Sequence, residues 1–283
     1  MERLFKPSRV MELLSKYNFR FSKSLGQNFL IDGNIVKKIV DSAEVEEFDN
    51  VLEIGPGIGT LTEELSLRAK KVVAIEIDNK LRELLDESLP YENIKIYFED
   101  VLKADLKAII SENFGEESFK VVANLPYYVT TPIISKLIEE DLNITSITVM
   151  IQKEVAKRFV AKPGTKDYGS LSVFIQFYSD VKYEFTVPNT VFMPKPNVDS
   201  GVVSLKIKSE LPDIDREKFF KVVKASFSKR RKTLINALSS YGFSATKSEI
   251  LQALSVSNID PTRRAETLTP REFIVLSINF PDI

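Results

Sequence analysis

The chain has 283 residues, with 39 Lys or Arg, 40 Asp or Glu, and no His, Cys or Trp. This length suffices for one large domain, or for a large and a small one, with a substantial buried core. Without His and Cys the chain cannot form a Ser-His-Asp triad, a Cys-His nucleophile pair or a zinc site of the HExxH or CxxC type. If the protein is an enzyme, we therefore expect a cofactor to supply the reactive group.

The composition also indicates a compartment. The lack of Cys fits a reducing environment. The sequence has no signal peptide and no apolar run of about 20 residues that could span a bilayer. We therefore expect a cytoplasmic protein without a membrane partner.

The net charge of −1 conceals an uneven distribution. Residues 1–38 hold 8 basic and 3 acidic side chains, residues 39–182 hold 16 and 26, and residues 183–283 hold 15 and 11. Basic ends of this kind indicate a polyanionic partner, although a scatter of a few charges also occurs in ordinary proteins. Both interpretations stay open on charge alone.

In chain order, an amphipathic segment over residues 9–17 and a polar stretch over 19–29 come first. From about residue 50 to 208, short runs rich in β-branched residues alternate with longer amphipathic stretches, which predicts a mostly parallel sheet with crossover helices and an antiparallel end. Helices are expected over about 60–69, where Thr60 and Glu63 have capping-box spacing, and over 133–138, with Thr131 as cap and Pro132 first in the helix. The expected strands are 51–54, 72–77, 94–98, 121–125, 147–151, 173–177 and 202–207.

The last part of the chain has the signals of short helices. Asp215 can cap a helix over residues 216–227, and capping-box spacing recurs at Thr246 and at Thr269. Asp260, followed by proline, is a further helix-start signal. We expect an α/β domain over residues 1–209 and a small all-α domain over 210–283.

Three glycines, Gly55, Gly57 and Gly59, stand between an expected strand and an expected helix. A turn of this kind lets the backbone approach a ligand closely, because no Cβ intervenes. Glu76 ends the next strand, where a carboxylate can accept hydrogen bonds from both hydroxyls of a ribose. Asp100 ends the strand after that, at the same carboxyl edge of the sheet. The alternatives are a tight turn without a ligand and solvated carboxylates at strand ends.

The glycine spacing favours S-adenosylmethionine over a nicotinamide dinucleotide. A dinucleotide fingerprint requires Gly or Ala at position 60, where this chain has Thr60. The G-x-G-x-G pattern with Glu53 two residues earlier is typical of S-adenosylmethionine sites. A nicotinamide dehydrogenase is the less favoured alternative.

Residues 124–127 (NLPY) end the fourth expected strand on the same side as the glycine loop. The lone pair of an exocyclic amine such as adenine N6 is delocalised into the ring, so methylation is helped by hydrogen-bond acceptors that draw its N–H groups out of the ring plane. The side-chain oxygen of Asn124 and the carbonyl of Leu125 can act in this way, and Pro126 restricts the backbone between them and Tyr127. Tyr127 can stack on the base. The alternative is a strand followed by a proline turn and a buried Tyr.

Residues 218–232 (KFFKVVKASFSKRRK) hold seven basic side chains and no acidic one. Such a run can contact RNA phosphates, or it can be a solvated helix face. Arg20 and Lys23 are weaker candidates of the same kind. The expected RNA-binding residues are Lys221, Lys224, Lys229, Arg230, Arg231, Lys232, Arg263 and Arg264.

Taken together, residues 53–60 (EIGPGIGT), Glu76, Asp100 and residues 124–127 resemble the motifs of the ribosomal RNA adenine N6,N6-dimethyltransferases, the KsgA/Erm family. Three further segments resemble the KsgA branch: residues 23–30 (KSLGQNFL), 191–200 (VFMPKPNVDS) and 264–268 (RAETL). The resemblance extends over nearly the whole chain.

The resemblance implies a class I S-adenosylmethionine-dependent methyltransferase domain, Rossmann-like, followed by a small helical domain that binds the substrate. The implied reaction is dimethylation of two adjacent adenosines in a hairpin loop near the 3′ end of 16S ribosomal RNA. The implied partners are small-subunit RNA and the precursor 30S subunit, with the protein as a monomer. An Erm-type enzyme acting on large-subunit RNA, and an assembly factor with weak turnover, remain alternatives.

The resemblance also implies individual roles. Glu76 would hold the cofactor ribose, Asp100 its adenine, and Asn124 would face both cofactor and target amine. Phe192 would sandwich the target base against Tyr127, and the alternative for Phe192 is a hydrophobic plug under the proline-rich loop. The implied catalytic residues are Asn124, Leu125, Pro126, Tyr127 and Phe192, and the implied cofactor contacts are Gln27, Asn28, Leu30, Gly55, Gly57, Glu76, Ile77, Asp100, Val101 and Asn124. We expect no metal.

Overall fold

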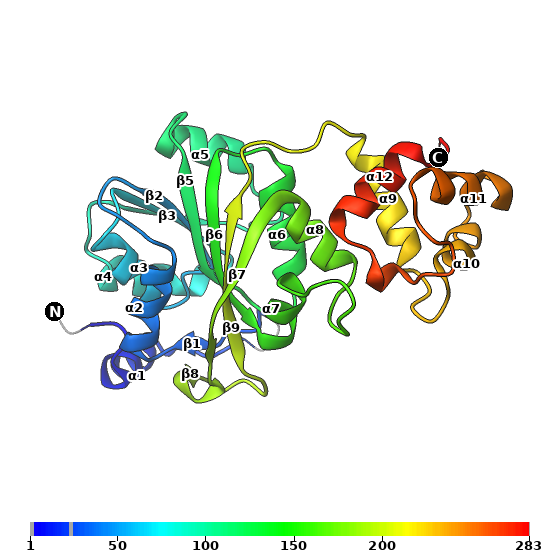
Figure 1. Cartoon of the computed structure of the whole chain (residues 1–283). Coiled ribbons are helices and arrows are strands. Elements are labelled where there is room, and N and C mark those ends of the chain that lie inside the picture. Colours follow the sequence, from blue (N-terminus) through cyan, green and yellow to red (C-terminus); the bar gives the residue numbers. More distant parts are fainter. Residues whose placement is uncertain (1–2, 23–24, 283) are drawn as a thin grey trace. The chain divides into compact units, whose positions relative to one another are not determined.

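The computed structural model describes residues 3–22 and 25–282 and divides into two compact units (Figure 1). The first unit consists of the described residues up to 156 and residues 182–207, and the second of residues 157–181 and the described residues from 208 onward. The elements of the chain up to residue 159 are α1 (Pro7–Lys16), β1 (Phe29–Leu30), α2 (Gly33–Ser42), β2 (Asn50–Ile54), α3 (Thr60–Ser66), β3 (Lys71–Glu76), η2 (Asn79–Leu81), α4 (Arg82–Ser88), β4 (Ile94–Phe98), α5 (Leu106–Phe114), β5 (Phe119–Asn124), α6 (Thr130–Glu139), β6 (Ile144–Gln152) and α7 (Lys153–Phe159). Those that follow are α8 (Ser170–Tyr178), β7 (Ser179–Val187), η3 (Asn189–Val191), β8 (Phe192–Met193), β9 (Ser200–Ile207), α9 (Arg216–Ser226), α10 (Leu234–Ser239), α11 (Lys247–Val256), η4 (Ala265–Thr267) and α12 (Pro270–Asn279).

A seven-stranded sheet in the order β4-β3-β2-β5-β6-β9-β7 forms the centre of the first unit. Strands β4, β3, β2, β5 and β6 are parallel, and β9 pairs with β6 in the antiparallel direction. The chain runs outward from β2 to β4 and then returns to the other side of β2 to form β5. This reversal creates a crevice outside the carboxyl ends of β2 and β5, which is where open α/β sheets bind ligands.

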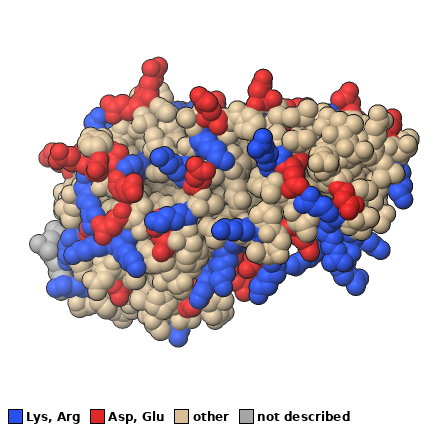
Figure 2. Space-filling view, viewed as in Figure 1, with Lys and Arg blue, Asp and Glu red and all other residues tan. Residues whose placement is uncertain are grey.

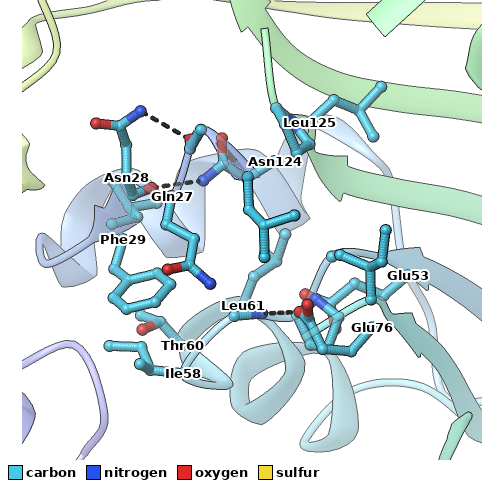
Figure 3. Close-up of a pocket in the computed structure, with 18 of the residues that line it drawn as sticks. Gln27, Asn28, Phe29, Glu53, Ile58, Thr60, Leu61, Glu76, Asn124 and Leu125 are labelled. Carbon is cyan, nitrogen blue, oxygen red and sulfur yellow. Dashed lines mark hydrogen bonds between the residues drawn. The ribbon is translucent and has the colours of Figure 1, made fainter. Parts of the chain in front are cut away.

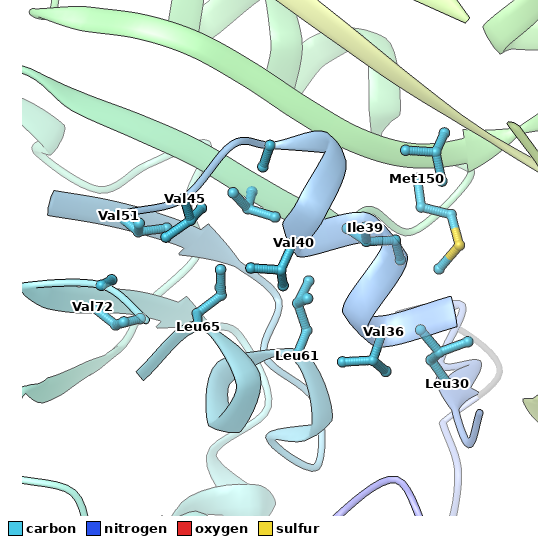
Figure 4. Packing of buried hydrophobic residues seen from close by; sticks show 14 of the residues in the cluster. Leu30, Val36, Ile39, Val40, Val45, Val51, Leu61, Leu65, Val72 and Met150 are labelled. Carbon is cyan, nitrogen blue, oxygen red and sulfur yellow. The ribbon is translucent and has the colours of Figure 1, made fainter. Parts of the chain in front are cut away.

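Helices α2 and α3 cover one face of the sheet, with α5 and α6 on the other (Figure 1). The core under α2 consists of aliphatic side chains from these helices and from the strands below them (Figure 4). Its members include Val36, Ile39 and Val40 of α2, Leu61 and Leu65 of α3, and Val51, Val72, Val122 and Met150 of the sheet, all buried. In a second cluster, Val10, Leu13 and Leu14 of α1 pack with Leu81 of η2 and with Leu84 and Leu85 of α4.

The helix expected over residues 60–69 is present as α3, but it is not capped in the way that the sequence predicted. Helix α3 begins at Thr60 as expected, but Gly59 precedes it with φ +86° and no side chain caps it, so the capping box predicted from Thr60 and Glu63 does not form. Glu63 instead accepts hydrogen bonds from the backbone N–H of Leu4 and from Arg3. The glycine turn alone therefore starts this helix.

One expected strand is a helix. The prediction of a strand over residues 173–177 is wrong, because these residues belong to α8, and the neighbouring strand β7 was missed. Val173, Ile175, Phe177 and Tyr178 of α8 are all buried. A short apolar run gives no helical periodicity when residues around most of the helix are buried, so its sequence resembles that of a buried strand.

Helix starts in the second unit follow the predicted caps closely. Asp215 accepts a hydrogen bond from the Lys218 N–H at the start of α9, and complete capping boxes open α11 at Thr246 and α12 at Thr269. Asp260 instead lies in a turn, where it accepts hydrogen bonds from the backbone and hydroxyl of Thr262.

Aromatic rings join α8 to α9, and the end of α9 to α12, in the core of the second unit. The ring centroids of Phe177 and Phe219 are 4.8 Å apart, and those of Phe227 and Phe273 are 5.7 Å apart. Residues 157–181, which the sequence analysis assigned to the first domain, thus pack with the C-terminal helices. No helix among the described residues is long and apolar enough to cross a membrane.

Candidate functional site

A cleft opens at the carboxyl ends of β2, β3 and β5 in the first unit (Figure 3). Its floor is the glycine loop, and one wall is the segment of residues 25–30, which we call the strap. An adjoining apolar pocket shares Gly55, Ile77 and Pro126 with the cleft. The structure thus brings together segments separated by about 100 residues in the sequence, because the parallel strands all end at one edge.

The glycine loop has the backbone conformation that its sequence predicts. Gly55, Gly57 and Gly59 all have positive φ, between +58° and +86°. A Cβ at Gly55 would meet no atom within 4 Å, which leaves space for a ligand directly beside the backbone. A Cβ at Gly57 would lie 3.0 Å from the ring of Phe29 in the strap. The lack of a side chain at Gly57 therefore lets the strap pack closely against the loop. The lack of one at Gly55 lets a ligand approach the backbone.

Two carboxyl groups are buried side by side under this loop (Figure 3). Glu76 accepts hydrogen bonds from the N–H groups of Gly57 and Asp78, at 3.0 and 2.8 Å. Oε2 of Glu53 is buried and has no hydrogen-bond partner among the described residues. Burial is the largest cause that raises the pKa of Glu53 to about 8 and that of Glu76 to about 7. Both groups therefore take up or release protons near neutrality.

Two polar side-chain atoms that line the cleft have no hydrogen-bond partner among the described residues, as expected for a site that binds a polar ligand. The hydroxyl of Thr60 is buried without a hydrogen-bond partner among the residues that the structure describes. Together with Glu53, it leaves two polar atoms unsatisfied beside the open space at Gly55. Buried polar groups in native proteins are nearly always satisfied, so these atoms indicate a bound partner.

The adjoining pocket is apolar, with Asp100 at its rim. Asp100 is partly exposed, and its Oδ1 accepts a hydrogen bond from the Leu102 N–H at 3.0 Å. Val101 is buried beneath it, while the side chain of Ile77 is 46% exposed and lies between the pocket and the cleft. The pocket is lined by Ile54, Ile75, Ile77, Val101, Val129 and Ile133, among others. A flat ring with a polar edge, such as a purine, matches this environment.

Asn124 ends β5 and faces the strap across the cleft (Figure 3). Its Nδ2 donates a hydrogen bond to the carbonyl of Asn28 at 3.3 Å. The backbone N–H of Leu125 donates to the carbonyl of Met150 at 3.1 Å, and Leu125 is 1% exposed. These contacts fix the main chain that carries the Leu125 carbonyl into Pro126.

Tyr127 follows this turn and is partly exposed at the cleft. Its hydroxyl lies 2.8 Å from the hydroxyl of Ser200 on β9. Burial raises the pKa of Tyr127 above its usual value, so the hydroxyl stays protonated at neutral pH. The hydrogen bond to Ser200 holds the ring in one orientation.

The structure does not bring Phe192 into the cleft. Its side chain is 4% exposed and belongs to the hydrophobic core together with Leu30, Val187 and Met150. Strand β8 pairs with β1, with Phe192 opposite Leu30 and Met193 opposite Phe29. In this arrangement Phe192 supports the strap from below and presents no face for stacking on Tyr127.

The expected RNA-binding residues from Lys221 to Arg264 lie in the second unit and differ in availability. Lys221, Lys224, Arg264 and the whole run from Lys229 to Lys232 are exposed, and Figure 2 shows basic side chains gathered along the lower edge of this unit. Arg230 donates to the carbonyl of Lys166 at 2.8 Å. Arg263 forms an ion pair with Glu272 and hydrogen bonds to Thr267, so its guanidinium is already used within the fold. Lys23 lies outside the described residues.

Sequence reasoning missed Asp78 and Ser200. Asp78 is 7% exposed and bonds the strap, and Ser200 bonds Tyr127. A signal for Asp78 was present, since it follows Glu76 by two residues and can cap the short helix η2. No signal local to Ser200 indicates its partner 73 residues away.

Among the described residues there is no group of three or more Asp and Glu side chains arranged to hold a metal ion.

Comparisons with known proteins agree with this geometry. A model of the family described as Ribosomal RNA adenine dimethylase matches residues 18–280. The chain is 56% identical over 278 residues to "Ribosomal RNA small subunit methyltransferase A" of Geobacillus sp. (strain WCH70), covering 96% of this chain and 95% of that protein. It is 51% identical over 283 residues to the protein of the same name from Alkaliphilus oremlandii (strain OhILAs), covering 99% and 98%.

Solved structures are similar as well. A dimethyladenosine transferase from Plasmodium falciparum superposes with a TM-score of 0.76 at 27% identity, over 88% of this chain and 95% of that one. The 23S rRNA methyltransferase ErmE superposes with a TM-score of 0.68 at 26% identity, over 89% and 99%. The α/β methyltransferase fold expected from the sequence is confirmed. With the family model matching nearly the whole chain, and with relatives more than half identical over 95% and 98% of their length, the chain belongs to the ribosomal RNA adenine dimethylase family.

Proposed function

We propose that this protein transfers methyl groups from S-adenosylmethionine to the N6 amines of two adjacent adenosines near the 3′ end of small-subunit ribosomal RNA. One observation carries the proposal: the acceptor pair of Asn124 and Leu125 lies in the same cleft as the open glycine loop and the buried carboxyl of Glu76. The name shared by relatives at 51% to 56% identity supports the small subunit as target.

The cleft suits a nucleoside cofactor part by part. Glu76 would accept hydrogen bonds from the ribose hydroxyls, and Asp100 from the adenine amine, with Ile77 and Val101 against the ring faces. The backbone at Gly55 and Gly57, the carboxyl of Glu53, and Gln27, Asn28 and Leu30 of the strap would enclose the amino-acid part. When bound, the cofactor supplies a methyl group on a cationic sulfur that is a good leaving group.

The residues of the 124–127 turn act on the target amine. Nδ2 of Asn124 is bonded to the strap, so Oδ1 is the atom left to accept a hydrogen bond from the amine. The Leu125 carbonyl accepts the second N–H, and the two acceptors together hold the nitrogen lone pair out of conjugation with the ring. Pro126 fixes the turn, and Tyr127 stacks on the base. Catalysis then depends on positioning, which a chain without His can provide.

The RNA would be held through its phosphates. Lys221, Lys224, Arg264 and the run from Lys229 to Lys232 offer exposed positive charge without reading base sequence. The proposed substrate is small-subunit RNA in a precursor 30S particle, and the enzyme is proposed to act as a monomer in the cytoplasm.

The test is methylation of undermethylated small subunits with S-adenosylmethionine, followed by mass spectrometry of nucleosides. We expect two dimethyladenosines per particle with the unchanged protein and a loss of more than about 100-fold in rate with Asn124→Ala. Asn236→Ala, on an exposed face of α10, serves as the control and should keep full activity. The absence of dimethyladenosine from small subunits in every assembly state would overturn the proposal, as would dimethyladenosine found only in large-subunit RNA when both subunits are offered.

A further inference from the structure

Asp78 is a buried acidic residue whose backbone N–H and both carboxylate oxygens form hydrogen bonds beside Glu76. Its backbone N–H donates to Oε1 of Glu76 at 2.8 Å. Its Oδ1 accepts from the Lys80 N–H at 3.1 Å, and its Oδ2 accepts from Nε2 of Gln27 at 2.8 Å. Asp78 thus connects the carboxyl group of Glu76 to a side chain of the strap.

Gln27 is held in one orientation by its two contacts. Nε2 donates to Asp78, and Oε1 accepts from the backbone N–H of Ser22 at 2.8 Å. Rotating the amide by 180° would oppose donor to donor at Ser22 and acceptor to acceptor at Asp78. The side chain points from the strap toward the loop side of the cleft (Figure 3). The contact therefore joins the strap to the residues after β3 in a single defined geometry.

The next residue of the strap reaches the catalytic side. The carbonyl of Asn28 accepts a hydrogen bond from Asn124, and the side chain of Asn28 donates to the Gly26 carbonyl at 3.0 Å. Two consecutive residues of the strap thus contact both sides of the site: Gln27 contacts Asp78 after β3, and Asn28 contacts Asn124 at the end of β5. Any shift of the strap at Gln27 is transmitted to the Asn124 amide through one peptide unit.

We propose that Asp78 and Gln27 form a latch that holds the strap over the cofactor cleft and keeps Glu76 and Asn124 in register. Both are positioning residues: Asp78 acts through Glu76 and the strap, and Gln27 fastens the strap. The inference rests on the proposed function only in taking S-adenosylmethionine as the occupant of the cleft. An intact latch lowers the cost of ordering the strap when the cofactor binds.

An exchange of the hydrogen-bond partners tests the latch directly. Asp78→Asn places an NH2 group against Nε2 of Gln27 while its Oδ1 still accepts from Lys80. The double variant Gln27→Glu with Asp78→Asn reverses the direction of the bond, because the new carboxylate on the strap would accept from the new amide and also from the Ser22 N–H. The double variant has the same total charge as the unchanged protein. Comparing it with Asp78→Asn therefore separates the loss of this hydrogen bond from a general disturbance of the fold.

Isothermal titration calorimetry with S-adenosylmethionine, and separately with its demethylated product S-adenosylhomocysteine, provides a readout besides activity. We expect Asp78→Asn to weaken binding of both about 10-fold, and the double variant to restore it to within about 3-fold. KM for the cofactor should rise in parallel, with kcat changed less than KM. Asp105→Asn, at the cap of α5, exchanges a similar capping carboxylate outside the cleft and should bind as the unchanged protein does.

The failure of this proposal can be told from failure of the proposed function. If the unchanged protein bound neither compound, the proposed cofactor would be wrong. If it bound both and Asp78→Asn bound equally well, or if the double variant bound no better than Asp78→Asn, the latch would be refuted while the methyltransferase function stood. Hydrogen exchange of the amides in residues 25–30 should be faster in Asp78→Asn and slow again in the double variant.

Discussion

The buried carboxyl of Glu53 makes stability depend on pH. Glu53 is 1% exposed on β2, and Oε2 finds no partner among the described residues. Burial is the main cause that raises its pKa from 4.5 to about 8, and the neighbouring Glu76 adds to the effect. The group is therefore neutral in the folded protein at pH 7 and ionised in the unfolded chain. Glu53→Gln replaces the neutral acid with a group of the same shape that does not titrate.

The sign of the effect follows from proton binding. Between pH 4.5 and about 8 the folded state holds the Glu53 proton and the unfolded state has lost it, so raising the pH favours unfolding. A pKa unit corresponds to about 1.36 kcal/mol, so the full shift corresponds to as much as about 5 kcal/mol. The stabilisation of Glu53→Gln relative to the unchanged protein should grow through this range and level off above it.

The assay is urea denaturation of the cofactor-free protein from pH 5 to pH 9, followed by circular dichroism. Titrating groups distant from Glu53 contribute equally to both proteins and cancel in the difference, whereas Glu76 interacts with Glu53, so its contribution changes in the variant. Glu47→Gln, at an exposed position in the turn before β2, is the matched control and should follow the unchanged protein at every pH. A difference between Glu53→Gln and the unchanged protein that stayed constant from pH 5 to pH 9 would refute the reasoning.

Three further predictions follow from the site and its supports. Tyr127→Ala should weaken RNA binding or turnover by about 1 to 3 kcal/mol because stacking is lost, whereas Tyr127→Phe loses only the bond to Ser200 and should keep most of the activity in the methylation assay. Lys229→Ala and Arg231→Ala should each reduce the salt dependence of RNA binding by about one unit of slope, and Lys218→Ala, whose ammonium pairs with Asp282, should change it less. Gly59→Ala should lower the free energy of unfolding by more than the roughly 1 to 2 kcal/mol that positive φ alone costs, because its Cβ would lie 2.9 Å from Leu89. Gly164→Ala, at φ +83° with no atom within 4 Å of its Cβ, measures the conformational cost alone, and equal losses of stability in the two variants would contradict this account.

Much of the cofactor side of the site could be predicted because it depends on local rules. Glycines between a strand and a helix specify positive φ, and residues at the ends of parallel strands meet at one edge of the sheet. Gly55, Glu76, Asp100 and Asn124 therefore lie together as expected. The same holds for helix starts in the second unit, since a capping residue and its partner are only three positions apart.

Other features were decided by packing between segments distant in the sequence. The run over residues 173–177 is apolar in a way that fits a strand or a buried helix, and only its contacts with α9 select the helix. Phe192 is a cleft candidate by its motif, yet pairing of β8 with β1 places it in the core. Arg263 looks available in the sequence, but Glu272 engages it.

The sequence by itself determined the glycine loop and the polar residues that end the successive parallel strands. It also determined the acceptors that can act on an amine in a chain without His. Only the tertiary structure decided the protonation of Glu53 and Glu76 and the bond between Gln27 and Asp78. The physical reason is that backbone conformation responds to neighbours within a few residues, whereas desolvation and long-range hydrogen bonds exist only after the strap, the loop and the sheet have come together.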